Sequence, residues 1–146
     1  MKIIIDTIPH KEQRYNTVGD WYPDQLTTKL PDGSSVVESI LRIRVSQLPA
    51  NAPAGAPAWK CEALVAVHEL IEAVLCMNDN ITPKQVDDFD RTFSGQDPGD
   101  DPTAPYKRQH CTATGIERLL ASLMGVDWLT YDEVLTKLTI PAPEKR

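Results

Sequence analysis

The chain lacks long apolar runs, and no segment approaches the roughly eighteen consecutive apolar residues that a membrane-spanning helix needs. It also lacks an excess of positive charge, because its formal net charge is -6. Such a balance is unfavourable for non-specific binding to nucleic acid or to an anionic membrane. The first ten residues, MKIIIDTIPH, do not have the long apolar region and cleavage site of a signal peptide. We therefore expect a cytoplasmic protein without a membrane or nucleic-acid partner.

Cysteine is scarce as well. The three cysteines, Cys61, Cys76 and Cys111, are odd in number and have no CxxC spacing, which predicts reduced thiols. Hydrophobic residues at 41% and charged residues at 25% are ordinary for a globular domain and argue against wholesale disorder. We expect a single domain over residues 1–146, in which one core is large enough for stability without disulfides.

The first fifty residues are rich in strand signals. Residues 2–8 are rich in β-branched side chains and are followed by Pro9, and residues 40–48, ILRIRVSQL, alternate Ile or Leu with Arg. Between them, Pro-Asp-Gly at residues 31–33 predicts a hairpin that joins residues 25–30 to residues 36–40. The pattern predicts a small antiparallel or mixed sheet within residues 1–50.

Residues 57–140 are predicted to be mainly helical. Helical patterns with start or stop signals cover residues 63–76, 83–93, 106–124 and 130–140. Thr82 opens the second helix with a capping box, Gly125 ends the third, and Thr130 with Glu133 forms a capping box for the fourth.

Between the second and third helices, residues 94–105 are dense in Gly, Pro and Asp and predict a long exposed loop. We expect residues 141–146 to form a charged tail. The order of elements predicts an α+β fold, with the strands segregated at the N-terminal end and about four helices after them.

The segment over residues 63–76, ALVAVHELIEAVLC, contains only three polar residues, His68, Glu69 and Glu72. A helix that is apolar on nearly every face is normally buried. His68 and Glu72 share a helical face, and Glu69 lies about 100° round from His68. Burying these groups without partners would cost several kcal/mol, so they must be hydrogen-bonded, paired, neutralised or bound to a cation.

His68 to Glu72 has the form HExxE, which is the zinc motif HExxH with its second histidine replaced by glutamate. In the parent motif the outer residues bind zinc and the intervening glutamate acts as general base. We expect His68, Glu72 and His110 to bind a divalent metal, with Glu117 as a fourth ligand or behind the first three, and Glu69 as the catalytic base. Zinc is the first candidate, although a carboxylate ligand also suits manganese or iron.

Asp100 and Asp101 are weaker candidates for the third ligand. They lie in the loop that precedes the helix carrying His110.

Two resemblances bear on the fold and the function. The strand ILRIRVSQL, the HExxE helix and a later helix with a third ligand resemble the minimal zincin arrangement of metallopeptidase domains. HELIEAVLC, VDDFD, DDPTAPY with a following histidine, and GVDW are similar to a family of small uncharacterised bacteriophage and prophage proteins over most of the chain. The zincin resemblance implies a peptidase-type metal-dependent hydrolase, with a peptide as one candidate substrate. The second resemblance implies a phage protein in the cytoplasm of a bacterial host.

One alternative is an inert hydrogen-bonded network in a non-catalytic phage accessory or binding protein. Its expected pairs are His68 with Glu117, and Glu72 with Arg118 or Tyr106. The oligomeric state stays open at this point.

A second alternative rests on carboxylate spacing. Glu69 and Glu72, followed by Asp87 and Asp90, resemble the ExxE…ExxD magnesium site of all-α nucleotide pyrophosphohydrolases of the MazG type. Four carboxylates on paired helices would suit magnesium and a triphosphate.

Overall fold

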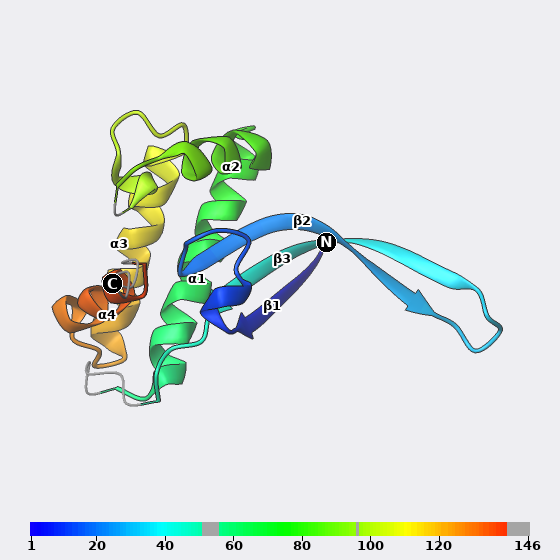
Figure 1. Cartoon of the computed structure of the whole chain (residues 1–146), viewed down its shortest axis with the longest axis horizontal. Helices are drawn as coiled ribbons and strands as arrows, with labels where there is room; N and C mark the ends of the chain where they lie inside the picture. The colour runs from blue at the N-terminus through cyan, green and yellow to red at the C-terminus, as the bar shows by residue number, and fades with distance from the viewer. Residues whose placement is uncertain (51–55, 96, 140–146) are drawn as a thin grey trace, which may run out of the picture.

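The structure is a computed structural model that describes residues 1–50, 56–95 and 97–139. It confirms the predicted α+β class, because a three-stranded mixed sheet precedes four α-helices within the described residues (Figure 1). The strands are β1 (Lys2–Ile8), β2 (Gly19–Lys29) and β3 (Ser35–Ser46). The helices are α1 (Ala58–Asn78), α2 (Pro83–Thr92), α3 (Lys107–Leu123) and α4 (Trp128–Thr139). The predicted tail over residues 141–146 lies outside the described residues.

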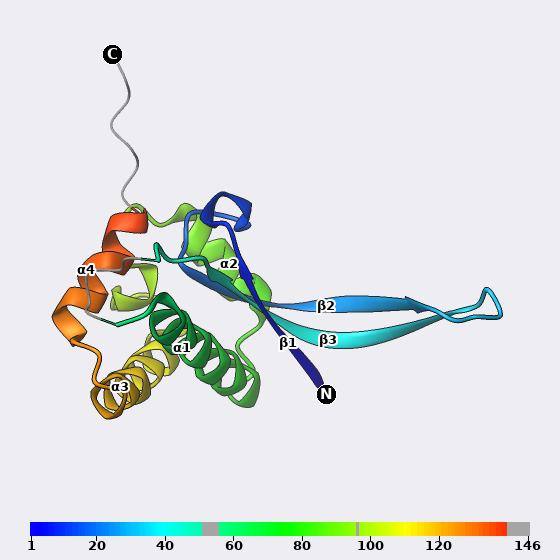
Figure 2. The same cartoon turned by 90° about the horizontal axis from the view of Figure 1, so that it is seen from below.

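The sheet has the strand order β1-β3-β2, with β1 parallel and β2 antiparallel to β3. The predicted hairpin joins β2 to β3, and Gly33 takes a φ of 85° in its turn. Figures 1 and 2 show that the hairpin projects far beyond the helices. Only the other end of the hairpin, near Gly19 and Val45, lies against the body of the protein and helps to build the site.

The core lies between the sheet and α1. Alternate side chains of β3, which include Leu41, Ile43 and Val45, are at most 4% exposed and belong to one core cluster with Leu64 of α1. Full burial of such a side chain contributes about 1.5–3 kcal/mol. α3 packs beside α1, and Figure 2 shows the two helices side by side. Among the described residues, every helix is too short or too polar to cross a membrane.

The helix ends follow the sequence signals in two cases and depart from them in one. Thr82 forms the predicted capping box with Gln85, and Gly125 follows α3 with a φ of 68°. The capping box predicted at Thr130 is wrong, because α4 begins two residues earlier, at Trp128. The carboxylate of Asp127 accepts hydrogen bonds from the backbone N–H and the hydroxyl of Thr130, so Asp127 takes the cap position.

Candidate metal centre

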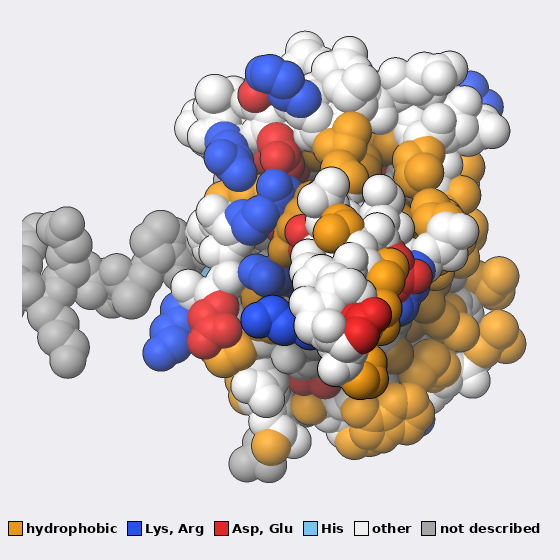
Figure 3. All heavy atoms as spheres, turned by 90° about the vertical axis from the view of Figure 1, so that its right-hand side faces the viewer, with side chains coloured by type: hydrophobic (Ala, Val, Ile, Leu, Met, Phe, Trp, Pro, Cys, Tyr) orange, Lys and Arg blue, Asp and Glu red, His pale blue; other side chains and the backbone are white. Residues whose placement is uncertain are grey.

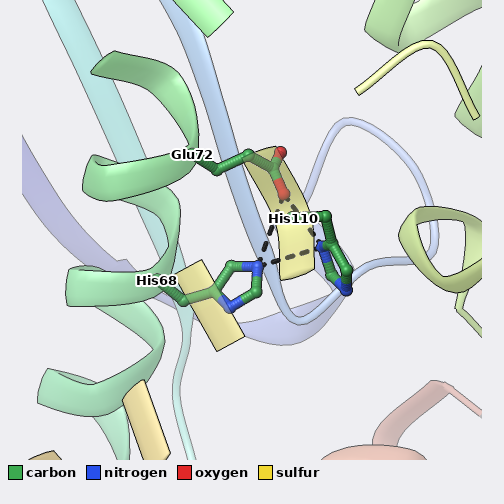
Figure 4. A group of neighbouring side chains, drawn as sticks. All are labelled: His68, Glu72 and His110. Carbon is green, nitrogen blue, oxygen red and sulfur yellow. Dashed lines mark hydrogen bonds and ion pairs between the residues drawn. The ribbon is translucent and has the colours of Figure 1, made fainter. Parts of the chain in front are cut away.

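Three buried side chains point toward one another between α1 and α3 (Figure 4). His68 and Glu72 come from α1, and His110 comes from α3. His68 Nε2 lies 3.2 Å from His110 Nδ1 and 3.4 Å from Glu72 Oε2, and the last two atoms are 2.9 Å apart. Because these three atoms come so close together, the His-Glu-His group could hold a metal ion.

The size of this triangle fits a first coordination shell. Metal–ligand distances of about 2.0–2.2 Å put neighbouring ligand atoms roughly 3.3–3.6 Å apart in a tetrahedron and roughly 2.8–3.1 Å apart in an octahedron. The observed sides, 2.9 to 3.4 Å, span both geometries. The donor set therefore suits a divalent ion, and its spacing is equally compatible with zinc and with metals that prefer six ligands.

Glu117 lies behind the His68 ring and is not part of the triangle of three ligand atoms. Its Oε2 is 2.9 Å from His68 Nδ1, the ring nitrogen turned away from the triangle, and its Oε1 accepts a 2.5 Å hydrogen bond from Tyr131. A carboxylate on the outer nitrogen fixes a metal-binding histidine in one tautomer and one orientation. Of the two roles expected for Glu117, the geometry matches the supporting one.

His110 is held from its other side by the loop before α3. Its Nε2 lies 3.5 Å from Asp97 and 4.0 Å from Asp100. This part of the loop is less exposed than expected, because Gly99 is buried against His110. A Cβ atom at Gly99 would lie 2.4 Å from the His110 ring, so only glycine allows the approach. Asp101 instead accepts hydrogen bonds from Thr103.

Glu72 is positioned by a residue that the sequence analysis did not connect to the site. The indole N–H of Trp21 donates a buried 3.0 Å hydrogen bond to Glu72 Oε1, which leaves Oε2 directed at the two histidines. Burial alone would raise the pKa of Glu72, but hydrogen bonds from His110 and His68 outweigh it and lower the pKa to about 2. In the sequence Trp21 stands ahead of the strand predicted over residues 25–30, whereas in the structure it lies within β2.

The two histidines show how strongly this site attracts positive charge. Burial alone would lower both pKa values, but Glu117 and Glu72 raise the pKa of His68 well above its ordinary value. Asp97 and Glu72 raise the pKa of His110 to about 10 against the same effect of burial. The same carboxylates that favour imidazolium would favour a bound cation, for which both imidazoles must be neutral.

Glu69 lies next to this group, on the adjacent face of α1. No group among the described residues donates a hydrogen bond to its carboxylate, and burial beside Glu72 raises the pKa of Glu69 well above its ordinary value. Space for the side chain depends on Gly19 of β2, where a Cβ atom would lie 2.3 Å from Glu69 Oε1. A glycine at the start of β2 is therefore part of the site, although the sequence analysis assigned it no role.

The group opens into a cavity of about 1070 Å³. The start of β2, the loop before α3 and parts of α1, α3 and α4 contribute to its walls. Among the described residues, nine carboxylate side chains and two arginines line it, together with aromatic rings such as Phe93 and Trp128. Asp90 accepts hydrogen bonds from Tyr106 and Tyr15, and burial raises its pKa to about 6.

The structure shows one of the pairs expected for an inert network. His68 does contact Glu117, but Glu72 contacts Trp21 and His110 instead of Arg118 or Tyr106. Arg118 lies over the Trp128 ring, 4.9 Å from its centroid.

The expected magnesium quartet is divided between different partners. Asp87 binds Arg14 through contacts of 2.8 and 3.0 Å, and Asp90 accepts from two tyrosines. The N-terminal sheet also departs from the all-α fold that this resemblance implies.

No family model, curated protein or solved structure matches this chain.

Proposed function

We propose that this protein is a metal-dependent hydrolase of the zincin-like type, with zinc as the first candidate for its metal. The observation that carries the proposal is the triangle of His68 Nε2, Glu72 Oε2 and His110 Nδ1 at the wall of a large cavity. Glu69 adds a carboxylate that has no hydrogen-bond donor among the described residues and lines the same cavity. A metallohydrolase needs at least a set of metal ligands and, next to it, a carboxylate that can act as the general base.

In such a hydrolase the side chains around the triangle would have different roles. A divalent ion at the triangle would act as a Lewis acid and would lower the pKa of a water molecule toward neutrality. Glu69 would accept the proton of the attacking water and deliver it to the leaving group. Trp21 and Glu117 would hold Glu72 and His68 in their orientations, because each occupies the atom of its partner that faces away from the ion.

The cavity also suggests the charge of the substrate. Nine carboxylic side chains line the cavity against two arginines and two histidines, so acidic groups outnumber basic ones and would favour a cation, and aromatic rings can bind a cation on their faces. We therefore favour a substrate with positive charge, such as a peptide that carries Lys or Arg near the bond to be cleaved.

The first test is metal content combined with peptide cleavage. Protein purified without added metal is expected to contain one equivalent of a divalent ion by elemental analysis, and His110→Ala is expected to lose it. Cleavage of a mixed peptide library, followed by mass spectrometry, is expected to occur next to basic residues. Glu69→Gln is expected to keep the ion while turnover falls by about 10²–10⁴-fold.

Glu133→Gln is the matched control for Glu69→Gln. Glu133 is exposed and pairs with Lys137 on α4, so its loss should change neither metal content nor turnover. A protein without metal, whose stability responds neither to chelator nor to added zinc, would contradict the proposal.

A second candidate function is a non-catalytic binding protein in which the metal group only supports the fold. The buried chain from Tyr131 through Glu117 to His68 favours it, because each hydrogen bond in that chain is satisfied without substrate. Glu69→Gln separates the two candidates. A scaffold would show a change in stability only, whereas an enzyme would lose turnover.

A further inference from the structure

One wall of the cavity carries a carboxylate with aromatic side chains around it. Asp90 of α2 lines the cavity, and so do Tyr15, Phe93 and Tyr106. The hydroxyl of Tyr15 donates a 3.1 Å hydrogen bond to Asp90 Oδ2, and the hydroxyl of Tyr106 donates one to Asp90 Oδ1. We call these four side chains the aromatic subsite.

The two phenols leave part of the Asp90 carboxylate open. An ionised carboxylate offers about four lone-pair sites, so each oxygen keeps an acceptor site after it has accepted one hydroxyl. Both partners are neutral, and Asp90 forms no ion pair among the described residues. Asp87, about one turn earlier on α2, instead pairs with Arg14 and Arg91. The charge of Asp90 therefore has no compensating cation within the subsite.

Basic side chains are not scarce in this chain, but they lie elsewhere. The chain has 15 lysines and arginines, and Figure 3 shows several of them gathered on one side of an outer surface. Of the described lysines and arginines, only Arg91 and Arg118 line the cavity. Arg91 is directed to Asp87, and Arg118 lies over the Trp128 ring. The open acceptor sites of Asp90 are therefore left to a cation from outside the protein.

The surroundings of Asp90 favour an organic cation over a metal ion. Among the described residues, the group of side chains that could hold a metal ion is His68, Glu72 and His110, and Asp90 is not part of it. The subsite offers aromatic rings in place of further ligands. A carboxylate beside aromatic rings binds ammonium groups through an ion pair and cation–π contacts.

A lysine side chain fits the subsite better than an arginine side chain. Its ammonium group is a compact point charge, which needs only one open lone pair. The planar guanidinium binds best to two carboxylate oxygens at once, and a phenol already occupies part of each Asp90 oxygen. The apolar stem of a lysine would pack against the rings while its charge meets the carboxylate.

The aromatic subsite lies beside the candidate metal centre. The ring of Tyr106 lies 6.3 Å from the ring of His110, centroid to centroid. Burial raises the pKa of Asp90, and the charge of Glu72 raises it further, so these two carboxylates are close enough to interact. A substrate held at Asp90 would therefore have its neighbouring bonds near the ligand triangle.

We propose that the aromatic subsite binds the ammonium group of a lysine side chain in the substrate. The role of the bound lysine rests on the proposed hydrolase function, because the lysine would bring a neighbouring peptide bond to the metal. Binding itself needs no turnover and can be measured separately.

The test is an NMR titration at pH 8, where Asp90 is ionised, with lysine that carries an N-acetyl and a C-terminal methylamide group. Norleucine with the same caps has the same stem without the charge. We expect capped lysine to bind at least about tenfold more tightly than capped norleucine, and more tightly than capped arginine. Asp90→Asn is expected to weaken lysine binding by at least about tenfold and to leave norleucine binding unchanged. This variant should stay folded, because it removes a charge that has no ion pair.

Asp88→Asn is the matched control. Asp88 carries the same charge on the same helix, pairs with Lys84 and does not line the cavity, so this variant should bind capped lysine as the unmodified protein does. Phe93→Leu keeps the charge of the subsite and removes one ring, and it is expected to weaken lysine binding by about 3–10-fold.

Three results would overturn the proposal. They are capped lysine that binds no more tightly than capped norleucine, capped arginine that binds more tightly than capped lysine, and an Asp90→Asn variant that binds lysine within twofold of the unmodified protein. Norleucine methylamide with a free amino terminus tests the other source of an ammonium group, and tighter binding of this probe than of capped lysine would also overturn the assignment.

The titration and the cleavage assay fail independently. A protein that binds capped lysine through Asp90 and cleaves no peptide would support the ammonium site and contradict the hydrolase. A protein that cleaves peptides and does not bind capped lysine would support the hydrolase and overturn the ammonium site.

Discussion

Replacing Glu117 by glutamine removes one negative charge from behind His68 and hardly changes the volume of the side chain. In the native protein His68 Nδ1 lies 2.9 Å from Glu117 Oε2, and Tyr131 holds the other oxygen at 2.5 Å. The carboxylate therefore keeps the proton of a neutral His68 on Nδ1 and leaves Nε2 free to bind a metal. A neutral amide holds this tautomer less firmly and makes the imidazole a weaker ligand.

The expected loss can be estimated from the position of Glu117. Partners of this kind typically change metal affinity by about 10–100-fold, which corresponds to about 1.4–2.8 kcal/mol. We expect Glu117→Gln to fall in this range and Tyr131→Phe to lose less, since the phenylalanine variant keeps the charge and only frees one carboxylate oxygen. The measurement is a competition titration against a chromogenic zinc chelator at constant pH and ionic strength.

Glu133→Gln serves again as the control, because Glu133 pairs only with exposed Lys137 among the described residues and should bind zinc as the unmodified protein does. If Glu117→Gln bound zinc within twofold of the unmodified protein, Glu117 would not orient His68. The metal would then either bind elsewhere or use a different nitrogen. That result would refute the reasoning even if the protein proved to contain zinc.

Three further predictions concern the surroundings of the site. Gly99→Ala places a methyl group against His110 and is expected to weaken zinc binding by at least about tenfold in the same titration, whereas Gly115→Ala, with open space around it, should not. Burial raises the pKa of Asp90 to about 6, so the folded state loses stability as the pH rises from about 4 through 6. Asp90→Asn should therefore gain about 1–2 kcal/mol at pH 8 and nothing at pH 4 in urea unfolding, and an equal gain at both would contradict this cause. Removal of metal by a chelator should lower the free energy of unfolding by about 4 kcal/mol relative to protein with free zinc at 1,000 times its dissociation constant. His68→Ala should abolish that difference in thermal unfolding.

Much of the fold could be predicted because local signals agreed with one another. Strand alternation, the Pro-Asp-Gly turn and helical periodicity indicated the sheet and the helices in their correct order. His68 and Glu72 are four residues apart, and His110 and Glu117 are seven apart, so each pair had to lie on one side of its helix. Burial of these polar groups then required that they meet partners, and the two helices bring them together.

Other features of the site could not be predicted, because they depend on contacts between residues that are far apart in the sequence. Trp21 and Tyr131 come from opposite ends of the chain, and their roles follow only once β2 and α4 lie beside the site. The close approaches of Gly19 and Gly99 to site side chains are likewise set by packing. Thr130 and Glu133 match a capping box in sequence, but in the structure the carboxylate of Asp127 accepts the hydrogen bond from the N-terminus of α4.

The hydrogen bonds around the site join segments that are distant along the chain. The bond from Trp21 to Glu72 closes 51 residues, and that from His110 to Glu72 closes 38. Closure of such loops costs entropy before the contacts form, so we expect the ligand triangle to form late in folding. An ion that binds only this late structure stabilises the native state more than the folding transition state. Bound metal is therefore expected to slow unfolding of the protein and to have little effect on its folding rate.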